Sequence, residues 1–421
     1  MQALRHPFVR DFAIGRFVAT CATQIIATTV GWQLFQRTGD SFSLGLVGLV
    51  EIIPVIFLIV PAGNAIDRHP RKQVAARAHA LLAAAALGLA ALTALDGPTA
   101  GIYALLVLTG AARAYAAPST GTIMPQLLSP HEFANANVWL SASYQLAAAV
   151  GPGLGGLLVA VSGGAFVPYL VSVVLIGVFL VLLTRIPTVV PPRQTTKRTS
   201  AELFAGFTFV RSQPVFLAAI TLDLFAVLFG GATALLPAYA AKILHVGAAG
   251  YGWLRAAPAL GALATALLLA RQPPWRRPGV VMLWTVLGFG LASIAFGLSE
   301  SFGLSFVMLL LVGGFDEVSV IIRHTLEQVI TPDRLRGRVS AINHVFIGFS
   351  NELGAFESGS AAALIGEVPA VVAGGLLTLV VVGIVALRWP ELRRIGPLHT
   401  LAPAAIPGLD EPSPATQERS A

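Results

Sequence analysis

Eight charged side chains fall inside long apolar stretches of the sequence, away from the polar segments that separate those stretches. They are Glu51, Arg113, Asp223, Arg255, Asp316, Glu317, Glu352 and Glu357. A charge at the centre of a lipid bilayer costs at least ~2.5 kcal/mol, so each is expected to face a partner or a water-filled cavity. A carboxylic acid held away from water favours its protonated form, which suits a group that exchanges protons. These residues indicate ion pairing, ligand binding or proton exchange inside a membrane.

Six of these residues are the candidates for a central cavity and for proton coupling. They are Asp316, Glu317, Asp223, Glu352, Glu51 and Arg113. Asp316 and Glu317 rank first among the acids, for their depth and for a position opposite Arg113, and Asp223 ranks before Glu352. Adjacent residues on a helix point about 100° apart, so only one of the first pair is expected to face the cavity. For Arg113, a substrate role and an ion pair that holds two bundles together both stay open.

The composition requires that most of the chain face lipid rather than water. Of 421 residues, 56% are hydrophobic and 11% are charged, whereas a soluble domain carries roughly 25% charged residues. The formal net charge of +7 comes from short basic clusters between apolar runs, a distribution typical of cytoplasmic loops rather than of nucleic-acid-binding surfaces. The single cysteine, Cys21, excludes a disulfide within the chain. The charged residues must therefore be positioned by membrane spans, and no nucleic-acid partner is expected.

Twelve apolar stretches are long enough, at about 20 residues each, to cross a ~30 Å hydrocarbon core. They lie near 12–35, 43–66, 74–95, 99–123, 136–161, 165–186, 214–241, 248–270, 279–299, 302–327, 339–364 and 368–389. Continuous apolar runs of this length predict helices, because barrel strands would alternate over ~10 residues. The first stretch is too long for a signal peptide and is expected to stay as a span. The predicted class is an all-α integral membrane protein.

Basic residues cluster in alternate connections between the predicted spans. The clusters are Arg68, Arg71 and Lys72; Arg193, Lys197 and Arg198; Arg271, Arg276 and Arg277; and Arg334, Arg336 and Arg338. The intervening connections hold little beyond Arg37 and Lys242. Because cytoplasmic loops carry an excess of Lys and Arg, an even number of spans places both termini in the cytoplasm.

A long connection at 187–213 divides the twelve spans into two groups of six. Residues 1–186 and 214–394 are predicted to form the N-terminal and C-terminal six-helix bundles, and residues 395–421 a disordered cytoplasmic tail. The apolar residues of the connection predict a short amphipathic helix at the membrane surface. They are Leu203, Phe204, Phe207, Phe209 and Val210.

The connection between the second and third spans reads GNAIDRHPRK, and its distinctive residues are Gly63, Asp67, Arg68, Arg71 and Lys72. Gly63 would permit close helix approach, and Asp67 can accept hydrogen bonds from a helix N-terminus or from an arginine of the other bundle. An ordinary basic turn is the alternative interpretation. The pattern resembles the loop signature G-x-x-x-D-R-x-x-G-R-R/K of the major facilitator superfamily, with a proline where the signature has its second glycine. The resemblance implies a loop that takes part in conformational change.

The fifth span contains GPGLGG, in which Gly151, Gly155 and Gly156 can pack closely against other helices and Pro152 permits a bend. The segment resembles the end, G-P-x-x-G-G, of the antiporter signature of drug exporters in the same superfamily. It also satisfies G-x-G-x-x-G, but a dinucleotide-binding loop would follow a strand, and this segment lies within a long apolar run.

The sequence contains no motif of an ATPase, a hydrolase or a zinc enzyme. A phosphate-binding loop and a nucleophile elbow are both absent. His131 and Glu132 begin like a zinc-protease motif, but Asn135 occupies the position of the second histidine. We therefore expect a protein that is not an enzyme and that holds neither a metal nor an organic cofactor.

Three further segments resemble the enterobactin exporter-like branch of the superfamily: LDLFAVLFGGATALLP, LRAAPALGA and FIGFSNELGAFESG. The resemblance implies the major facilitator fold, in which spans four and ten line a central cavity opened alternately to either side of the membrane. It also implies a monomeric, multi-pass protein of the bacterial inner membrane.

The expected function is secondary active transport, namely the proton-coupled efflux of small amphiphilic compounds that are siderophore- or drug-like. The proton gradient is the expected energy source, and the expected partners are a small-molecule substrate, protons and the lipid bilayer. Two alternatives stay open from the sequence. They are an importer or uniporter of a small polar solute, and a membrane sensor that does not transport.

Overall fold

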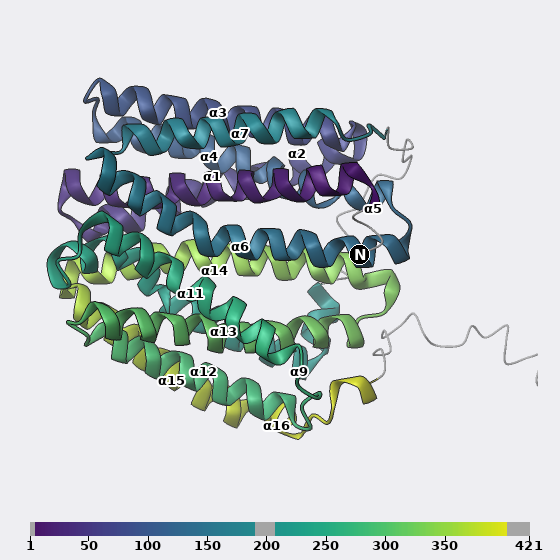
Figure 1. The fold of residues 1–421 in the computed structure, drawn as a ribbon. Helices are drawn as coiled ribbons and strands as arrows, with labels where there is room; N and C mark the ends of the chain where they lie inside the picture. Colours follow the sequence, from purple (N-terminus) through teal and green to yellow (C-terminus); the bar gives the residue numbers. More distant parts are fainter. Residues whose placement is uncertain (1–4, 190–206, 402–421) are drawn as a thin grey trace, which may run out of the picture.

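The chain folds into long helices that run side by side (Figure 1). A computed structural model describes residues 5–189 and 207–401, and neither range contains a β-strand. The long helices are α1 (Pro7–Thr38), α2 (Ser41–Arg68), α3 (Arg71–Ala94), α4 (Thr99–Gly121), α6 (Pro130–Ser162), α7 (Phe166–Thr184), α9 (Pro214–Phe229), α11 (Gly247–Leu269), α12 (Pro278–Gly297), α13 (Phe302–Ile330), α14 (Asp333–Ile365) and α15 (Glu367–Arg388). The short helical segments are α5 (Met124–Leu127), η2 (Gly231–Leu235), α10 (Leu236–Ala238), η3 (Tyr239–Ile243), α16 (Pro390–Arg394) and η4 (Leu398–Thr400). The predicted all-α class is confirmed.

Eleven helical segments of the described ranges are long and apolar enough to cross a membrane. The remaining long helix, α14, has 33 residues and packs against α2. Its charged residues, among them Glu352 and Glu357, make it more polar than the others. A helix of this length still exceeds the ~30 Å hydrocarbon core, so α14 is counted as the twelfth span.

The long helices form two groups that pack together along two helix pairs. Helices α1, α2, α3, α4, α6 and α7 form one group, here the N bundle, and α9, α11, α12, α13, α14 and α15 form the C bundle. Between them, α2 packs against α14 and α6 packs against α11. Each bundle has its own apolar core, which includes Leu34 and Leu82 in the N bundle and Phe216 and Met282 in the C bundle.

The predicted division of the chain at 1–186, 187–213, 214–394 and 395–421 stays a prediction. Residues 190–206 of the connection and 402–421 of the tail lie outside the described residues, and so do two members of the predicted amphipathic helix, Leu203 and Phe204. The described part of that helix spans 207–212. Phe207 is exposed there, whereas Phe209 and Val210 pack into the core of the C bundle.

The two ends of the molecule differ in charge. One end, here the basic end, holds the connections α2–α3, α11–α12 and α15–α16, with residues such as Arg68, Arg276 and Arg393. The start of α1, α5 and α16 lie together at this end (Figure 1). The other end, here the acidic end, carries four acids in its connections and at the start of α15. They are Asp40, Asp96, Glu300 and Glu367.

The seventh span departs from the continuous helix expected at 214–241. Helix α9 ends before Gly230, and the chain continues through a 3-10 turn, a short α-helical turn and a π turn up to Ile243. A side chain at Gly231 would lie 2.6 Å from the Gly354 carbonyl of α14, so the backbone lies close against α14 at this point. Pro237 follows, and proline cannot donate a backbone hydrogen bond. The glycines and the proline together explain why the helix is interrupted.

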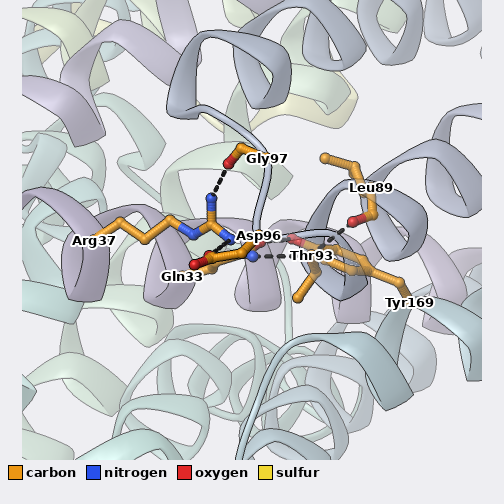
Figure 2. A network of polar contacts seen from close by, with 7 residues as sticks. All are labelled: Gln33, Arg37, Leu89, Thr93, Asp96, Gly97 and Tyr169. Atoms are coloured by element: carbon orange, nitrogen blue, oxygen red, sulfur yellow. Dashed lines mark hydrogen bonds and ion pairs between the residues drawn. The ribbon is translucent and has the colours of Figure 1, made fainter.

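A buried polar network fastens three helices of the N bundle near the acidic end (Figure 2). Gln33 of α1 donates to Thr93 Oγ1 of α3 at 2.8 Å and accepts from the hydroxyl of Tyr169 of α7 at 2.8 Å. Arg37 of α1 donates to the Gly97 carbonyl at 2.6 Å. Buried polar groups are costly to leave unpaired. The network therefore favours movement of α1, α3 and α7 as one body.

Candidate functional site

Three charged side chains meet in the middle of the molecule, where the two bundles face each other. Arg113 of α4 forms an ion pair with Glu51 of α2 through Nη1, and its Nη2 lies 3.2 Å from Glu352 Oε1 of α14. Arg113 and Glu51 belong to the N bundle, whereas Glu352 belongs to the C bundle. The triad of these three residues is therefore an electrostatic link between the bundles.

The triad is partly accessible in spite of its position along the helices. The Arg113 side chain is 46% accessible, and those of Glu51 and Glu352 are 14% and 20% accessible. Arg113 lies near the middle of α4, and its partners come from two facing bundles. A ligand or a proton could reach an accessible side chain at this contact between the bundles.

Glycines bring the backbones of these helices close enough for the triad to form. Gly110 lies one turn before Arg113, and a side chain there would lie 2.7 Å from Cγ of Pro54 in α2. Gly48 of α2 faces α14, where a side chain would lie 2.6 Å from the carbonyl oxygen of Glu352. Small residues permit this approach between membrane helices. The helix crossings at Gly110 and Gly48 therefore set the distances between the three charges.

A second arginine, Arg255, lies close enough to Glu352 to interact with its charge. Arg255 of α11 interacts electrostatically with Glu352, and it donates to the hydroxyl of Tyr251 at 3.3 Å. Tyr251 in turn stacks on Trp32 of α1 with ring centroids 5.8 Å apart. Glu352 thus lies between an arginine of each bundle. The sequence placed Arg255 among the charges inside apolar stretches, but it could not show that α11 brings this residue near Glu352.

The triad can hold or release a proton without leaving a large net charge. It contains two carboxylates and one guanidinium, so its acids can accept one proton and the triad becomes neutral. Protonation of Glu352 would remove the charge that attracts Arg113 across the interface. The arrangement can therefore couple a proton to the strength of the contact between the bundles.

Among the described residues, Asp316 and Glu317 are not the ion-pair partners of Arg113. Arg113 forms its ion pairs with Glu51 and Glu352, and the two acids of α13 interact electrostatically with each other. Both side chains are half-buried. Depth along a helix does not determine which charges pair, and the position of Asp316 and Glu317 opposite Arg113 stays a prediction.

Asp223 belongs to a charge network inside the C bundle rather than to a lone acid in a cavity. It forms an ion pair with Arg323 of α13, and both side chains are almost fully buried. Arg323 also interacts with Glu327, whose Oε2 accepts a hydrogen bond from Asn343 Nδ2 of α14 at 2.7 Å. Sequence reasoning missed Arg323 and Glu327. Both fall within the apolar stretch 302–327. The cost of placing a charge in lipid would have identified them as candidates.

Polar contacts fasten the two bundles at the acidic end. Lys242 Nζ lies 2.7 Å from Glu367 Oε1, and that same oxygen accepts a hydrogen bond from Ser41 of α2 at 3.0 Å. Lys242 also lies over the ring of Phe35 of α1, 5.2 Å from its centroid. Ser41 and Phe35 belong to the N bundle. These four residues, here the acidic-end clasp, hold the bundles together at this end.

The glycines of the fifth-span motif divide between two neighbours. Gly151 and Gly155 face α1, where their side chains would lie 2.6 Å from Gln24 Cβ and 3.1 Å from Thr28 Cβ. Gly156 faces α11 of the C bundle, where a Cβ would lie 2.7 Å from the Cα of Gly252. The carbonyl of Pro152 faces Gly252 as well, since a Cβ on Gly252 would lie 2.7 Å from it. The motif therefore packs α6 within its own bundle and also across the bundle interface.

The basic loop between α2 and α3 binds the ends of two other helices of its bundle. Arg71 donates to the carbonyl of Thr122 at 2.8 Å, and Lys72 donates to the carbonyls of Thr184 and Ile186 at 2.8 and 2.6 Å. These groups lie at helix C-termini, where cations are favoured. Asp67 is half-buried and interacts electrostatically with Arg71.

Two residues of the loop motif make no comparable contribution in this conformation. The side chain of Arg68 is exposed. A Cβ on Gly63 would have no atom within 4 Å. The close helix approach expected at Gly63 is therefore not present in this conformation.

Residues 12–356 match the family model of the Major Facilitator Superfamily. Among curated relatives, the enterobactin exporter EntS of Shigella boydii serotype 18 is 27% identical over 392 residues, which cover 92% of this chain and 93% of the relative. The enterobactin exporter EntS of Escherichia coli O1:K1 / APEC has the same identity and coverage.

Solved transporter structures share the fold. A bacterial homolog of the human lysosomal transporter Spinster, inward-facing and unoccupied, has a TM-score of 0.70 at 15% identity, covering 92% of this chain and 96% of that one. The nucleoside transporter NupG has a TM-score of 0.64 at 16% identity, covering 93% of this chain and 100% of that one. At these identities the likeness shows a common fold alone.

Proposed function

The chain belongs to the Major Facilitator Superfamily, and from this premise we propose that it is a proton-coupled exporter of small amphiphilic compounds. As a member of the family it is a multi-pass membrane transporter and not an enzyme. The observation that supports proton coupling is the triad of Arg113, Glu51 and Glu352. It places two acids that can bind protons on the contact between the two bundles.

Charge supports an orientation with the basic end in the cytoplasm, because cytoplasmic loops carry the excess of Lys and Arg. Both termini would then be cytoplasmic. Helical spans fit an inner membrane, since outer-membrane proteins are barrels. The clasp of Lys242, Glu367, Ser41 and Phe35 would lie on the outer side and keep that side closed. Such a conformation would receive substrate from the cytoplasm, as an exporter must.

Proton binding and opening of the outer side would be linked through Glu352. When this acid is ionised it attracts Arg113 across the interface, which favours the conformation described here. When a proton or a bound cationic substrate neutralises it, the attraction to Arg113 falls and separation of α2 from α14 becomes easier. A cationic or donor-rich substrate would favour the ionised acid, so substrate and proton would compete. Substrate binding then releases a proton, and reprotonation from outside expels the substrate.

The surroundings of Glu352 support an amphiphilic substrate. Phe349 lies one turn earlier on the same side of α14, and its side chain is 41% exposed. An exposed aromatic ring next to a cluster of charges can bind a molecule with both apolar and polar parts. The curated relatives are named as enterobactin exporters. Siderophore-like compounds, including enterobactin, are therefore the first class to screen by counterflow, followed by dyes and sugars.

The two sequence motifs have separate roles in this proposal. The loop of Asp67 and Arg71 would steady the cytoplasmic end of the N bundle during the conformational change. The crossing of Gly156 with Gly252 would close the outer side. Asp316 and Glu317 remain candidates for a second proton or substrate contact, and Asp223 becomes a structural member of the C bundle, because its charge is matched by Arg323.

Replacing Glu352 with glutamine is expected to abolish proton-driven transport and to preserve counterflow. An amide cannot carry the proton, but counterflow exchanges substrate without net proton movement. Both rates are measured in proteoliposomes with a substrate found by counterflow. The companion variants are Glu51→Gln, Glu317→Gln, Asp316→Asn and Asp223→Asn.

A variant of Asp223, which belongs to the charge network inside the C bundle, provides the contrast to Glu352→Gln. Asp223→Asn removes the ion-pair partner of the buried Arg323 and leaves Glu327 as its remaining counter-charge, so folding and both transport rates are expected to fall together. Proton-driven transport that persists in all five variants would refute the antiport mechanism. Facilitated diffusion would then be the better account.

A further inference from the structure

Four arginines converge on one hollow at the basic end of the C bundle. The hollow has a volume of about 410 Å³, and its lining residues are Arg276, Arg277, Arg393, Arg394, Ile395 and Gly396. Two of the arginines precede α12 and two end α16, so they come from connections far apart in the sequence. All four side chains are exposed. None of the functions assigned above uses this hollow.

Packing of α16 against α12 brings the two arginine pairs together. Leu392 of α16 is 1% exposed and belongs to the core of the C bundle. Gly279, in the first turn of α12, faces the carbonyl of Leu392 without a side chain in between. The position of α16 is thus fixed by a buried anchor. Arg393 and Arg394 follow that anchor directly and are held next to Arg276 and Arg277.

The convergence of these charges is not required by membrane topology. The topology rule needs basic residues on one side of the membrane, but it does not need them in one place. Within 5–189 and 207–401, no carboxylate forms an ion pair with any of the four arginines. Like charges repel, so four guanidinium groups around one hollow favour an anion placed among them.

The surroundings indicate that the anion belongs to a lipid. Trp275 immediately precedes Arg276, and Trp389 immediately precedes α16. Tryptophan is enriched at the boundary between membrane and water. The α11–α12 connection also lines a second, largely apolar hollow of about 240 Å³, bounded by Leu269, Trp275 and Ile321. One connection therefore offers both a basic hollow and an apolar one.

We propose that this basic hollow binds the phosphate headgroup of an anionic phospholipid of the cytoplasmic leaflet. Arginine forms paired hydrogen bonds with phosphate oxygens, so the four guanidinium groups suit a phosphodiester ligand. Basic pockets at the cytoplasmic side of membrane helices bind such headgroups. A bound lipid would bridge α12 and α16 and hold the end of the C bundle to the membrane surface.

The test compares lipids bound to the full-length protein by native mass spectrometry. The probes are cardiolipin and phosphatidylglycerol, with phosphatidylcholine as the uncharged reference. The wild-type protein is expected to retain the anionic lipids, and Arg393→Gln combined with Arg394→Gln is expected to weaken their binding by roughly tenfold or more. The matching lysine double variant keeps the charge and is expected to recover most of the binding.

A control variant distinguishes an effect of the basic hollow from an effect of positive charge in general. Arg10→Gln combined with Arg271→Gln removes two exposed charges at the same end but outside the hollow, and it is expected to bind lipid as the wild type does. Equal losses in the two glutamine variants would overturn the proposal. Inorganic phosphate at constant ionic strength should leave the bound lipid in place. Its displacement by phosphate would assign the hollow to a soluble ligand and overturn the lipid assignment.

Discussion

Replacing Arg113 with glutamine is expected to reduce transport by roughly ten- to a hundredfold. The change leaves Glu51 and Glu352 facing each other across the bundle interface without the cation that now lies between them. Removing one partner of a buried ion pair costs ~3–5 kcal/mol, and the partial exposure of this triad reduces that cost. Glu51 and Glu352 would then stay protonated or repel each other, and the transport cycle would stop. Transport rate in proteoliposomes, at equal protein content, measures the effect.

A double variant serves as the matched control for this prediction. Combining Arg113→Gln with Glu352→Gln removes the uncompensated charge, so folding and counterflow are expected to recover while proton-driven transport does not. Wild-type transport by the single Arg113 variant would show that the triad plays no part in the cycle. Recovery of proton-driven transport by the double variant would contradict the coupling role of Glu352.

Adding one methyl group at Gly156 is expected to reduce transport by about tenfold. In Gly156→Ala the new Cβ would lie 2.7 Å from the Cα of Gly252, and neither backbone can yield as a flexible side chain would. Overpacking of this kind costs ~1–3 kcal/mol. The cost falls on the conformation in which α6 and α11 are in contact, so the population shifts toward the state that is open at the acidic end.

Gly153 provides the control, three residues away on the same helix. A Cβ at Gly153 would lie 3.9 Å from the ring of Trp253, an ordinary contact, so Gly153→Ala is expected to transport normally. Spin labels at Asp40 and His245, in a Cys21→Ala background, measure the separation of the bundles at the acidic end. Longer label distances are expected in Gly156→Ala alone. Unchanged distances and rates in that variant would show that this crossing does not close the outer side.

The fold was predictable from the sequence because its physical cause is local. Each span needs about 20 apolar residues regardless of its neighbours, and so the count of twelve could be made from composition along the chain. Helix α14 was found in the same way despite its charges. The break after α9 was not predicted, since it arises where Gly230 and Gly231 meet α14 and where Pro237 follows.

The members of the site were predictable, but their partners were not. The cost of a charge in lipid identified Glu51, Arg113 and Glu352 one at a time. Which charges meet depends on the rotation of each helix about its axis and on the crossings at Gly48 and Gly110. Neither the helix rotations nor the helix crossings can be read from a single sequence.

The same limit applies to the ranking of the acids. Asp316 was placed opposite Arg113 because the two lie at similar depth. The sequence likewise does not show that Asp223 forms an ion pair with Arg323 of α13.

The direction in which a proton gradient moves substrate tests proton-coupled export most directly. The protein is reconstituted with its basic end facing the outside of the vesicle, and the lumen is made acidic relative to the medium. Substrate is expected to accumulate in the lumen above its outside concentration as protons leave, and a protonophore is expected to abolish this accumulation. Equal concentrations on both sides, whatever the pH gradient, would contradict proton coupling. Accumulation that requires the opposite gradient would contradict export.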